Sequence, residues 1–260
     1  MTASFPTNIK SFSAKTDGVD DVMAADINDL QDEVAAIEGY GGGWTPAGET
    51  WTYASSTTFT VSGNQTGKYQ KGDKVKLTQT TVKYFYITNV VYSSPNTTVT
   101  VSGGDDYSLA NAAITLPYYS KAVNPQGFPR WFRWTPTLIS TGATFTYTFQ
   151  TGTFAINNGL VVFEASIQLG AAPGGTTSNS VSMGLPFTAA TISNSRMAFS
   201  VYWSLITLPA NMTVLTSYVA SSLAVATLRY TGSGQTAAAL LASGMVNGTV
   251  LQISGQYFLG

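Results

Sequence analysis

Hydrophobic and polar positions alternate with two different periods along this chain, and the change of period divides it. Between Met23 and Ile37 the apolar residues recur at spacings of 4, 3, 4 and 3, the heptad pattern of a helix with one apolar stripe. From Trp44 onward, short apolar runs are separated by Gly, Pro, Asn and Asp, which is typical of strands and turns. The sequence therefore predicts one N-terminal helix followed by a mainly β chain.

The predicted helix carries an apolar stripe that is well suited to a short coiled coil. The stripe consists of Met23, Ile27, Leu30, Val34 and Ile37. Asp17 or Asp20 is expected to cap the helix, and Gly39 and the run Gly41–Gly43 to end it. Two heptads are marginal alone, so we expect them to set an oligomeric state, with packing on the same chain as the alternative. β-Branched residues at both core positions allow an order higher than a dimer.

Prolines and glycines divide the β region into two further domains. The chain is expected to comprise an extended segment (1–18), the helix with its glycine linker (19–43), a small antiparallel barrel or sandwich (44–133) and a C-terminal domain (134–260). The segment Asn124–Pro129 has two prolines and a glycine and predicts a neck between the last two domains. The C-terminal domain, with about eight strands, is expected to be a jelly-roll-like sandwich.

Individual strands of the C-terminal domain follow from their patterning. Leu160–Leu169 is predicted as one strand, while Thr144–Gln150 and Thr153–Asn157 are predicted as two. The sequence Asn157-Asn158-Gly159 predicts a hairpin, because Asn-Gly suits a primed turn.

Charge is scarce and unevenly distributed. Only 10% of the residues are charged, against about 25% in average globular chains. The net charge is −6 over residues 1–38, +4 over 39–133 and +1 over 134–260, where three charged residues remain. The net charge of −1 gives no reason to expect nucleic acid as a partner. No signal peptide or membrane-spanning segment is apparent, so the sequence predicts a soluble protein without membrane insertion.

Catalytic chemistry has little support in this sequence. The chain contains neither histidine nor cysteine, which excludes imidazole bases, thiol nucleophiles and thiolate metal sites. The last 127 residues hold one carboxylate, Glu164, whereas glycoside hydrolysis usually needs two. Asp105 and Asp106 follow two glycines and predict a solvated turn, with a calcium ion as the less favoured alternative. We therefore expect no enzyme activity, no cofactor and no metal site.

Binding residues are sought among aromatic and cationic side chains of the C-terminal domain. Aromatic faces stack on sugar rings and guanidinium groups clamp acidic ones. The candidates are Tyr202, Trp203, Arg196 and Arg229, and their alternative role is in the core or at a subunit contact.

The layout resembles the fibre and receptor-binding proteins of tailed bacteriophages. The resemblance rests on FPTNIKSFSAKTDGVDDVMAADINDLQDEVAAIE at the N-terminus, with Asp26, Asn28, Leu30, Gln31, Glu33 and Ile37 as its core. It continues in KGDKVKLTQTTVKYFYITNV and NPQGFPRWF in the middle, and in WTPTL, GLPFTA and SGQYFL near the end.

This resemblance implies a virion structural protein that trimerises. Its N-terminal segment would attach to other virion proteins, and its distal β domain would bind a host-surface receptor, a glycan or a protein. Attachment to the tail and attachment to the capsid, as a head fibre or decoration protein, both remain open. No catalytic residue is carried over, because the resembling motifs contain none.

Overall fold

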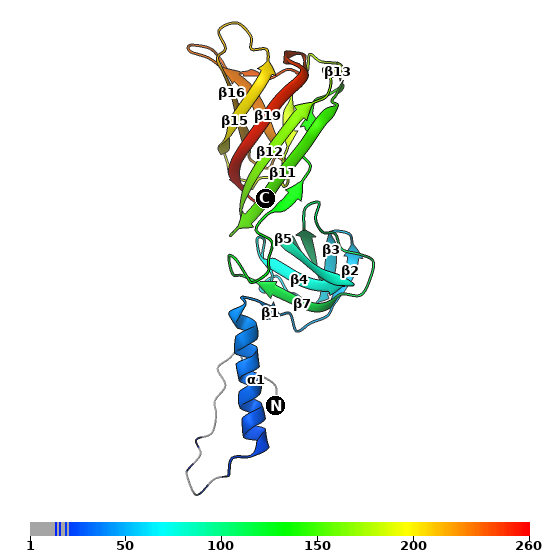
Figure 1. Ribbon diagram of the computed structural model, residues 1–260, viewed down its shortest axis with the longest axis vertical. Coiled ribbons are helices and arrows are strands. Elements are labelled where there is room, and N and C mark those ends of the chain that lie inside the picture. Colours follow the sequence, from blue (N-terminus) through cyan, green and yellow to red (C-terminus); the bar gives the residue numbers. More distant parts are fainter. Residues whose placement is uncertain (1–13, 15, 17–18, 20) are drawn as a thin grey trace.

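The three parts of the protein follow one another along a single axis. The computed structural model describes residues 14, 16, 19 and 21–260. Figure 1 shows the helix α1 at one end of the molecule. A small β domain (the middle domain) lies next to the C-terminal end of this helix, and a larger β domain (the distal domain) lies at the other end. The predicted mainly β class with an N-terminal helix is confirmed.

The helix α1 spans Ala24–Gly41. At its start the Met23 backbone N–H donates a hydrogen bond to the Asp26 carboxylate, at 2.9 Å, so an acid in the first turn satisfies a free backbone donor. The predicted caps Asp17 and Asp20 lie outside the described residues. Gly39 lies inside the helix, because one glycine costs only about 1 kcal/mol there, and the helix ends at Gly41, the first glycine of the predicted run.

The predicted glycine linker after the helix is packed against the body of the protein. Gly43 has a φ of +77°, and a Cβ there would lie 3.3 Å from Pro125. The Gln126 backbone N–H donates to the Gly42 carbonyl at 2.8 Å, and the Trp44 indole N–H donates to the Gln126 carbonyl at 2.7 Å. The helix therefore leaves the middle domain through a fixed joint.

The middle domain is a curved, seven-stranded antiparallel sheet. In spatial order its strands are β1 (Thr45–Pro46), β7 (Thr115–Ser120), β4 (Lys74–Gln79), β5 (Thr81–Ser93), β6 (Asn96–Ser102), β3 (Thr58–Ser62) and β2 (Trp51–Ser55). Alternate residues point inward, and the core includes Trp51 stacked on Phe59, with ring centroids 4.3 Å apart. Tyr69 closes this core, since its hydroxyl accepts from the Trp51 indole at 3.1 Å and donates to the Glu49 carboxylate.

The distal domain is a ten-stranded sheet folded into a sandwich, with a separate two-stranded sheet. The main sheet consists, in spatial order, of β8 (Phe132–Trp134), β11 (Tyr147–Asn157), β12 (Leu160–Leu169), β19 (Met245–Phe258), β15 (Arg196–Ile206), β16 (Val214–Ala220), β17 (Val225–Thr231), β14 (Ser182–Gly184) and β9 (Leu138–Ile139), with β18 (Ala238–Ala239) paired to β17. The small sheet pairs β10 (Ala143–Thr144) with β13 (Gly174–Gly175), and a short 3-10 helix spans Ala242–Gly244.

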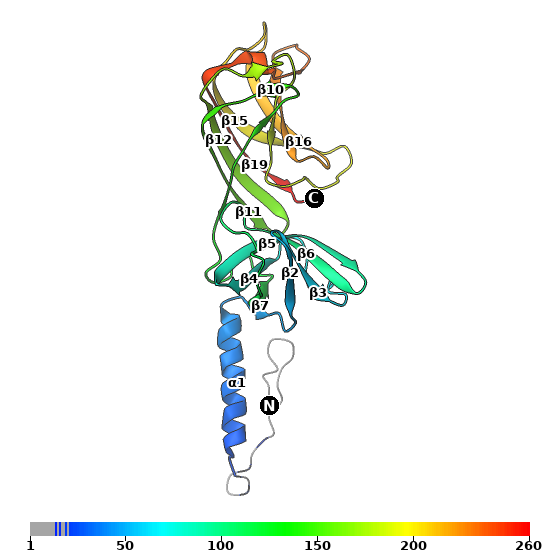
Figure 2. The same ribbon diagram turned by 90° about the vertical axis from the view of Figure 1, so that its right-hand side faces the viewer.

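Strand β15 forms the corner of the sandwich. Its first residues pair with β16 and its later residues pair with β19, so the strand belongs to both layers. Figure 2 shows β12, β15 and β19 on one side and β16 on the other.

The β11–β12 hairpin agrees with the prediction except in one strand boundary. β12 has the predicted bounds, and Asn158 and Gly159 have φ values of 50° and 79°, as a type I′ turn requires. The two strands predicted over Thr144–Gln150 and Thr153–Asn157 are wrong, because one strand, β11, runs through both. Gly152 lies inside β11 and makes room for Trp134 of β8, whose indole nitrogen would be 2.4 Å from a Cβ there.

A shared aromatic core joins the middle and distal domains. Phe132 of β8 lies 5.3 Å from Tyr86 of β5 and 5.9 Å from Phe154 of β11, measured between ring centroids. Phe132 is also paired with Phe154 in the distal sheet, so the domain boundary predicted between residues 133 and 134 falls inside a strand. The two domains therefore pack as one body.

Candidate functional site

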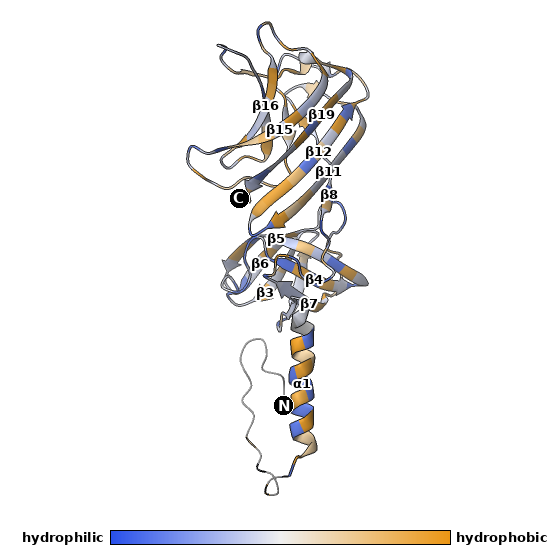
Figure 3. Ribbon diagram, turned by 60° about the vertical axis from the view of Figure 1, so that its left-hand side comes forward, coloured by the Kyte–Doolittle hydropathy of each residue, from blue (hydrophilic) through white to orange (hydrophobic). Residues whose placement is uncertain are grey.

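The first candidate surface is the apolar stripe of α1, which is exposed in the single chain. The exposed fractions are 61% for Met23, 47% for Ile27, 51% for Leu30, 45% for Val34 and 52% for Ile37. Figure 3 shows apolar segments repeating along the whole helix. A contiguous apolar stripe of this kind usually marks a protein contact.

Two acids of the same helix show the opposite behaviour. Asp29 and Glu33 are 8% and 6% exposed, and both interact with other groups. Charged side chains are rarely buried unless they are paired. The apolar positions of α1 are thus more open to solvent than two of its acidic ones, which is the reverse of a helix packed by its apolar face on its own chain.

Two of the predicted receptor-binding residues lie on opposite faces of β15. Tyr202 is 60% exposed on the outer face of the sheet, whereas Trp203 packs against the hydrophobic core. Neighbouring residues of a strand point to opposite sides, so these two rings cannot form one binding platform.

The two predicted arginines are engaged within the chain. The Arg196 guanidinium lies 5.1 Å from the centre of the Tyr218 ring, and the Arg229 guanidinium donates to the Ala237 carbonyl at 2.5 Å. Arg196 is six residues from Tyr202, about 20 Å along an extended strand. The structure therefore does not bring the four predicted residues together.

Glu164, the one carboxylate side chain of the C-terminal domain, lies on an open sheet face. Glu164 is exposed on the outer sheet face, paired in register with Thr153 and Ser254. Within residues 21–260 and the other described positions, no group of three or more acidic side chains could hold a metal ion.

Asp105 and Asp106 connect the middle domain to the distal domain. The Asp106 carboxylate accepts from the Arg133 backbone N–H at 2.7 Å and from its side-chain Nε at 2.6 Å. The Thr135 hydroxyl donates to Asp105 at 2.8 Å. The predicted turn is present and Asp105 is exposed in it, but both carboxylates also accept hydrogen bonds from the start of the distal domain, which was not predicted.

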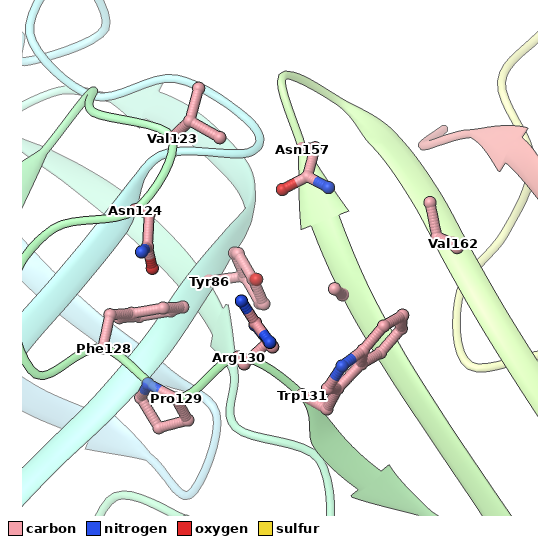
Figure 4. Close-up of a pocket in the computed structure, with 10 residues that line it drawn as sticks. Tyr86, Val123, Asn124, Phe128, Pro129, Arg130, Trp131, Asn157 and Val162 are labelled. Atoms are coloured by element: carbon pink, nitrogen blue, oxygen red, sulfur yellow. The ribbon is translucent and has the colours of Figure 1, made fainter.

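The second candidate surface is a cleft of about 430 Å³ between the middle and distal domains, here called the neck cleft. Figure 4 shows side chains from the neck segment (residues 121–131), from β5 and from the β11–β12 hairpin pointing toward it. The lining residues are Tyr86, Val123, Asn124, Phe128, Pro129, Arg130, Trp131, Ala155, Asn157 and Val162. Sequence reasoning missed this site, although the Arg130-Trp131 pair beside two prolines was a usable signal.

Buried rings form the inner wall of the neck cleft. Tyr86 and Phe128 are 2% and 8% exposed, with centroids 4.9 Å apart in an edge-to-face arrangement. The Lys74 ammonium lies 5.5 Å from the Tyr86 ring and 5.8 Å from the Phe128 ring. Burial lowers the pKa of Lys74, while the nearby Asp73 carboxylate acts in the opposite direction.

The Tyr86 hydroxyl joins the two domains at the same place. It forms a hydrogen bond with the backbone of Ile156 in β11. Burial raises the pKa of the Tyr86 hydroxyl, although this hydrogen bond acts to lower it. Tyr86 is therefore a structural wall of the cleft.

The rim of the neck cleft is polar and cationic. Trp131 is 45% exposed, and Arg130, Asn124 and Asn157 are also exposed. Among the described residues, no carboxylate forms an ion pair with the Arg130 guanidinium. The rim thus offers donors, acceptors and one indole face to a ligand.

The comparisons with known proteins give no further direction. No protein-family model matches this chain, and neither the curated proteins nor the solved structures contain a match. Among the described residues, none of the helices combines the length and the hydrophobicity of a membrane span.

Proposed function

We propose that this protein is a homotrimeric structural fibre protein of a tailed-phage virion. Its N-terminal region attaches to other virion proteins, and its distal domain binds a receptor on the host surface, a glycan in the first instance. The observation that carries the proposal is the exposed apolar stripe on α1, at the opposite end of the molecule from the distal domain.

Association would remove the exposed stripe from water. An isolated helix of 18 residues is about 27 Å long and marginal in water without packing. Ile27 and Val34 occupy one core position of the heptad, and Leu30 and Ile37 the other. Isoleucine or valine stands at three of these four positions, which allows more than two strands, while Leu30 is also compatible with a dimer. The choice of a trimer therefore follows the resemblance to phage fibre proteins.

Three copies on one axis would also favour adhesion. The fixed joint at Gly42–Trp44 holds each β body at the end of its helix, so a trimer presents three distal domains in one direction. Multivalent presentation raises the avidity of weak single sites by about 10²–10⁴. Weak glycan binding by each copy is then sufficient for attachment.

Competition with virions tests this function. Purified wild-type protein should block adsorption of the phage to its host. The double variant Ile27→Asp/Val34→Asp places charges in the stripe and should block adsorption much less, because it loses multivalency. A matched control, Asn28→Asp/Ala35→Asp, adds the same charges one position away and should compete like wild type.

Location on the particle separates the two forms of the proposal. Gold-labelled antibody against the distal domain should decorate the tail in electron micrographs of intact virions. Label on the head would instead identify a capsid-bound head fibre or decoration protein, and absence of label from virions would overturn the proposal.

A further inference from the structure

We propose that the neck cleft binds a saccharide that carries an acid group, a carboxylate or a phosphate on a sugar ring. The inference rests on the proposed receptor-binding function and assigns it a site, at the joint between the domains rather than on the strand β15. Three features of the cleft support it: its positive charge, its exposed aromatic face and its two carboxamides.

The charge of the cleft favours an anion. The Arg130 guanidinium stands at the rim, and the Lys74 ammonium lies behind the rings of the inner wall. Lys121, in the same neck segment, is already paired with Asp73 at 3.3 Å, so Arg130 is the cation that is available to a ligand. No carboxylate is among the described residues that line the cleft, so an acid group bound at Arg130 meets no like charge there.

The Trp131 indole provides a face for a sugar ring. It is 45% exposed and is accompanied in the cleft by the apolar side chains of Pro129 and Val162. Pyranose rings carry C–H groups on one face, which pack on aromatic rings, while their hydroxyls remain free for hydrogen bonds. The volume of about 430 Å³ lies within the range usual for small-molecule sites.

Two carboxamides from different segments line the cleft. Asn124 comes from the neck segment and Asn157 from the tip of the β11–β12 hairpin (Figure 4). Each amide has both donors and an acceptor, which suits the hydroxyls of a sugar. Their side chains form no hydrogen bond within the described part of the protein, so both remain available to a ligand.

The cleft is held in shape before any ligand binds. The hairpin tip rests on the middle domain, since a Cβ on Gly72 would lie 2.8 Å from the Gly159 nitrogen. The Asp106–Arg133 ion pair, at 2.6 Å, is a second contact that holds the two domains together. A preorganised site loses less conformational entropy when a ligand binds.

The test is a binding measurement with the full-length chain and a panel of oligosaccharides. The panel contains uronate-, sialate- and phosphate-bearing members, each beside its neutral counterpart, and the acid type that binds identifies the source of the anion. We expect acidic members to bind about tenfold or more tightly than neutral ones, since charge-assisted hydrogen bonds exceed neutral ones.

Two variants and one control assign the binding to the cleft. Arg130→Gln should remove the preference for acidic members, and Trp131→Ala should weaken binding of all members about tenfold or more. Arg196→Gln removes an exposed arginine of the distal domain that does not line the cleft, and should bind like wild type. Circular dichroism and the melting temperature report whether each variant is folded.

Three results would overturn the inference. They are the absence of binding to every acidic member, equal binding by wild type and the two folded cleft variants, and a change of oligomeric mass in Arg130→Gln, which would make the cleft a contact between copies. Failure of the proposed trimer is a separate result, because Ile27→Asp/Val34→Asp should keep the single-site affinity even as a monomer.

Discussion

Replacing Phe132 by alanine tests whether the middle and distal domains unfold as one body. The Phe132 side chain is 0% exposed, and its ring lies 5.3 Å from Tyr86, 5.5 Å from Phe128 and 5.9 Å from Phe154. Truncation of a buried phenylalanine costs about 3–5 kcal/mol, and each lost aromatic pair about 0.5–1.5 kcal/mol more than burial alone. We therefore expect a loss near the upper end, about 5 kcal/mol.

The assay is differential scanning calorimetry at fixed protein concentration. Wild type should unfold the two β domains in one transition, whereas Phe132→Ala should show two, the first at least about 10 °C lower. Phe149→Ala is the matched control, because that ring is 39% exposed and its loss should cost less than about 1 kcal/mol. Equal effects of the two variants, or a single unshifted transition in Phe132→Ala, would refute the shared core.

Three further predictions concern the joint and the sheet. Asp106→Ala should lower the free energy of unfolding by about 1 kcal/mol in urea titrations, because the ion pair with Arg133 is partly exposed, and Asp106→Asn should lose less. Gly152→Ala should cost about 1–3 kcal/mol in the same titrations, because the added carbon would meet the Trp134 indole. Burial raises the pKa of the Asp73 carboxyl above its ordinary value of 3.8. The protonated carboxyl therefore stabilises the folded state fully below pH 3.8, and this stabilisation is lost as the pH rises through the raised pKa. Asp73→Asn should remove this loss and flatten the plot of unfolding free energy against pH, and an unchanged slope would contradict the assignment.

Much of the fold could be predicted because local patterns determine it. The heptad stripe from Met23 to Ile37 and the alternation of Leu160–Leu169 are periodic enough to fix a helix and a strand. The Asn158-Gly159 turn follows from the need for positive φ. Gly152 was misleading, since its role is to admit Trp134 from a neighbouring strand, which the local pattern does not contain.

The candidate site could not be predicted in the same way, because it depends on contacts between distant segments. Asn124 and Asn157 are 33 positions apart and line one cleft only because the hairpin tip reaches the middle domain. Tyr202 and Trp203 attracted attention as adjacent aromatics, yet adjacency in a strand places them on opposite faces. The turn at Asp105 and Asp106 follows from the local sequence, whereas its hydrogen bonds to Arg133 and Thr135 do not, because those residues are distant along the chain.

The most direct test of the central claim is the mass of the full-length protein in solution, measured by multi-angle light scattering. Wild type should have a mass of about 82 kDa, three times that of the 27.4 kDa chain. The stripe variant Ile27→Asp/Val34→Asp should shift toward 27.4 kDa, while Asn28→Asp/Ala35→Asp should keep the wild-type mass. A wild-type mass of 27.4 kDa at micromolar concentration, or a stripe variant that remains a trimer, would contradict the proposed assembly.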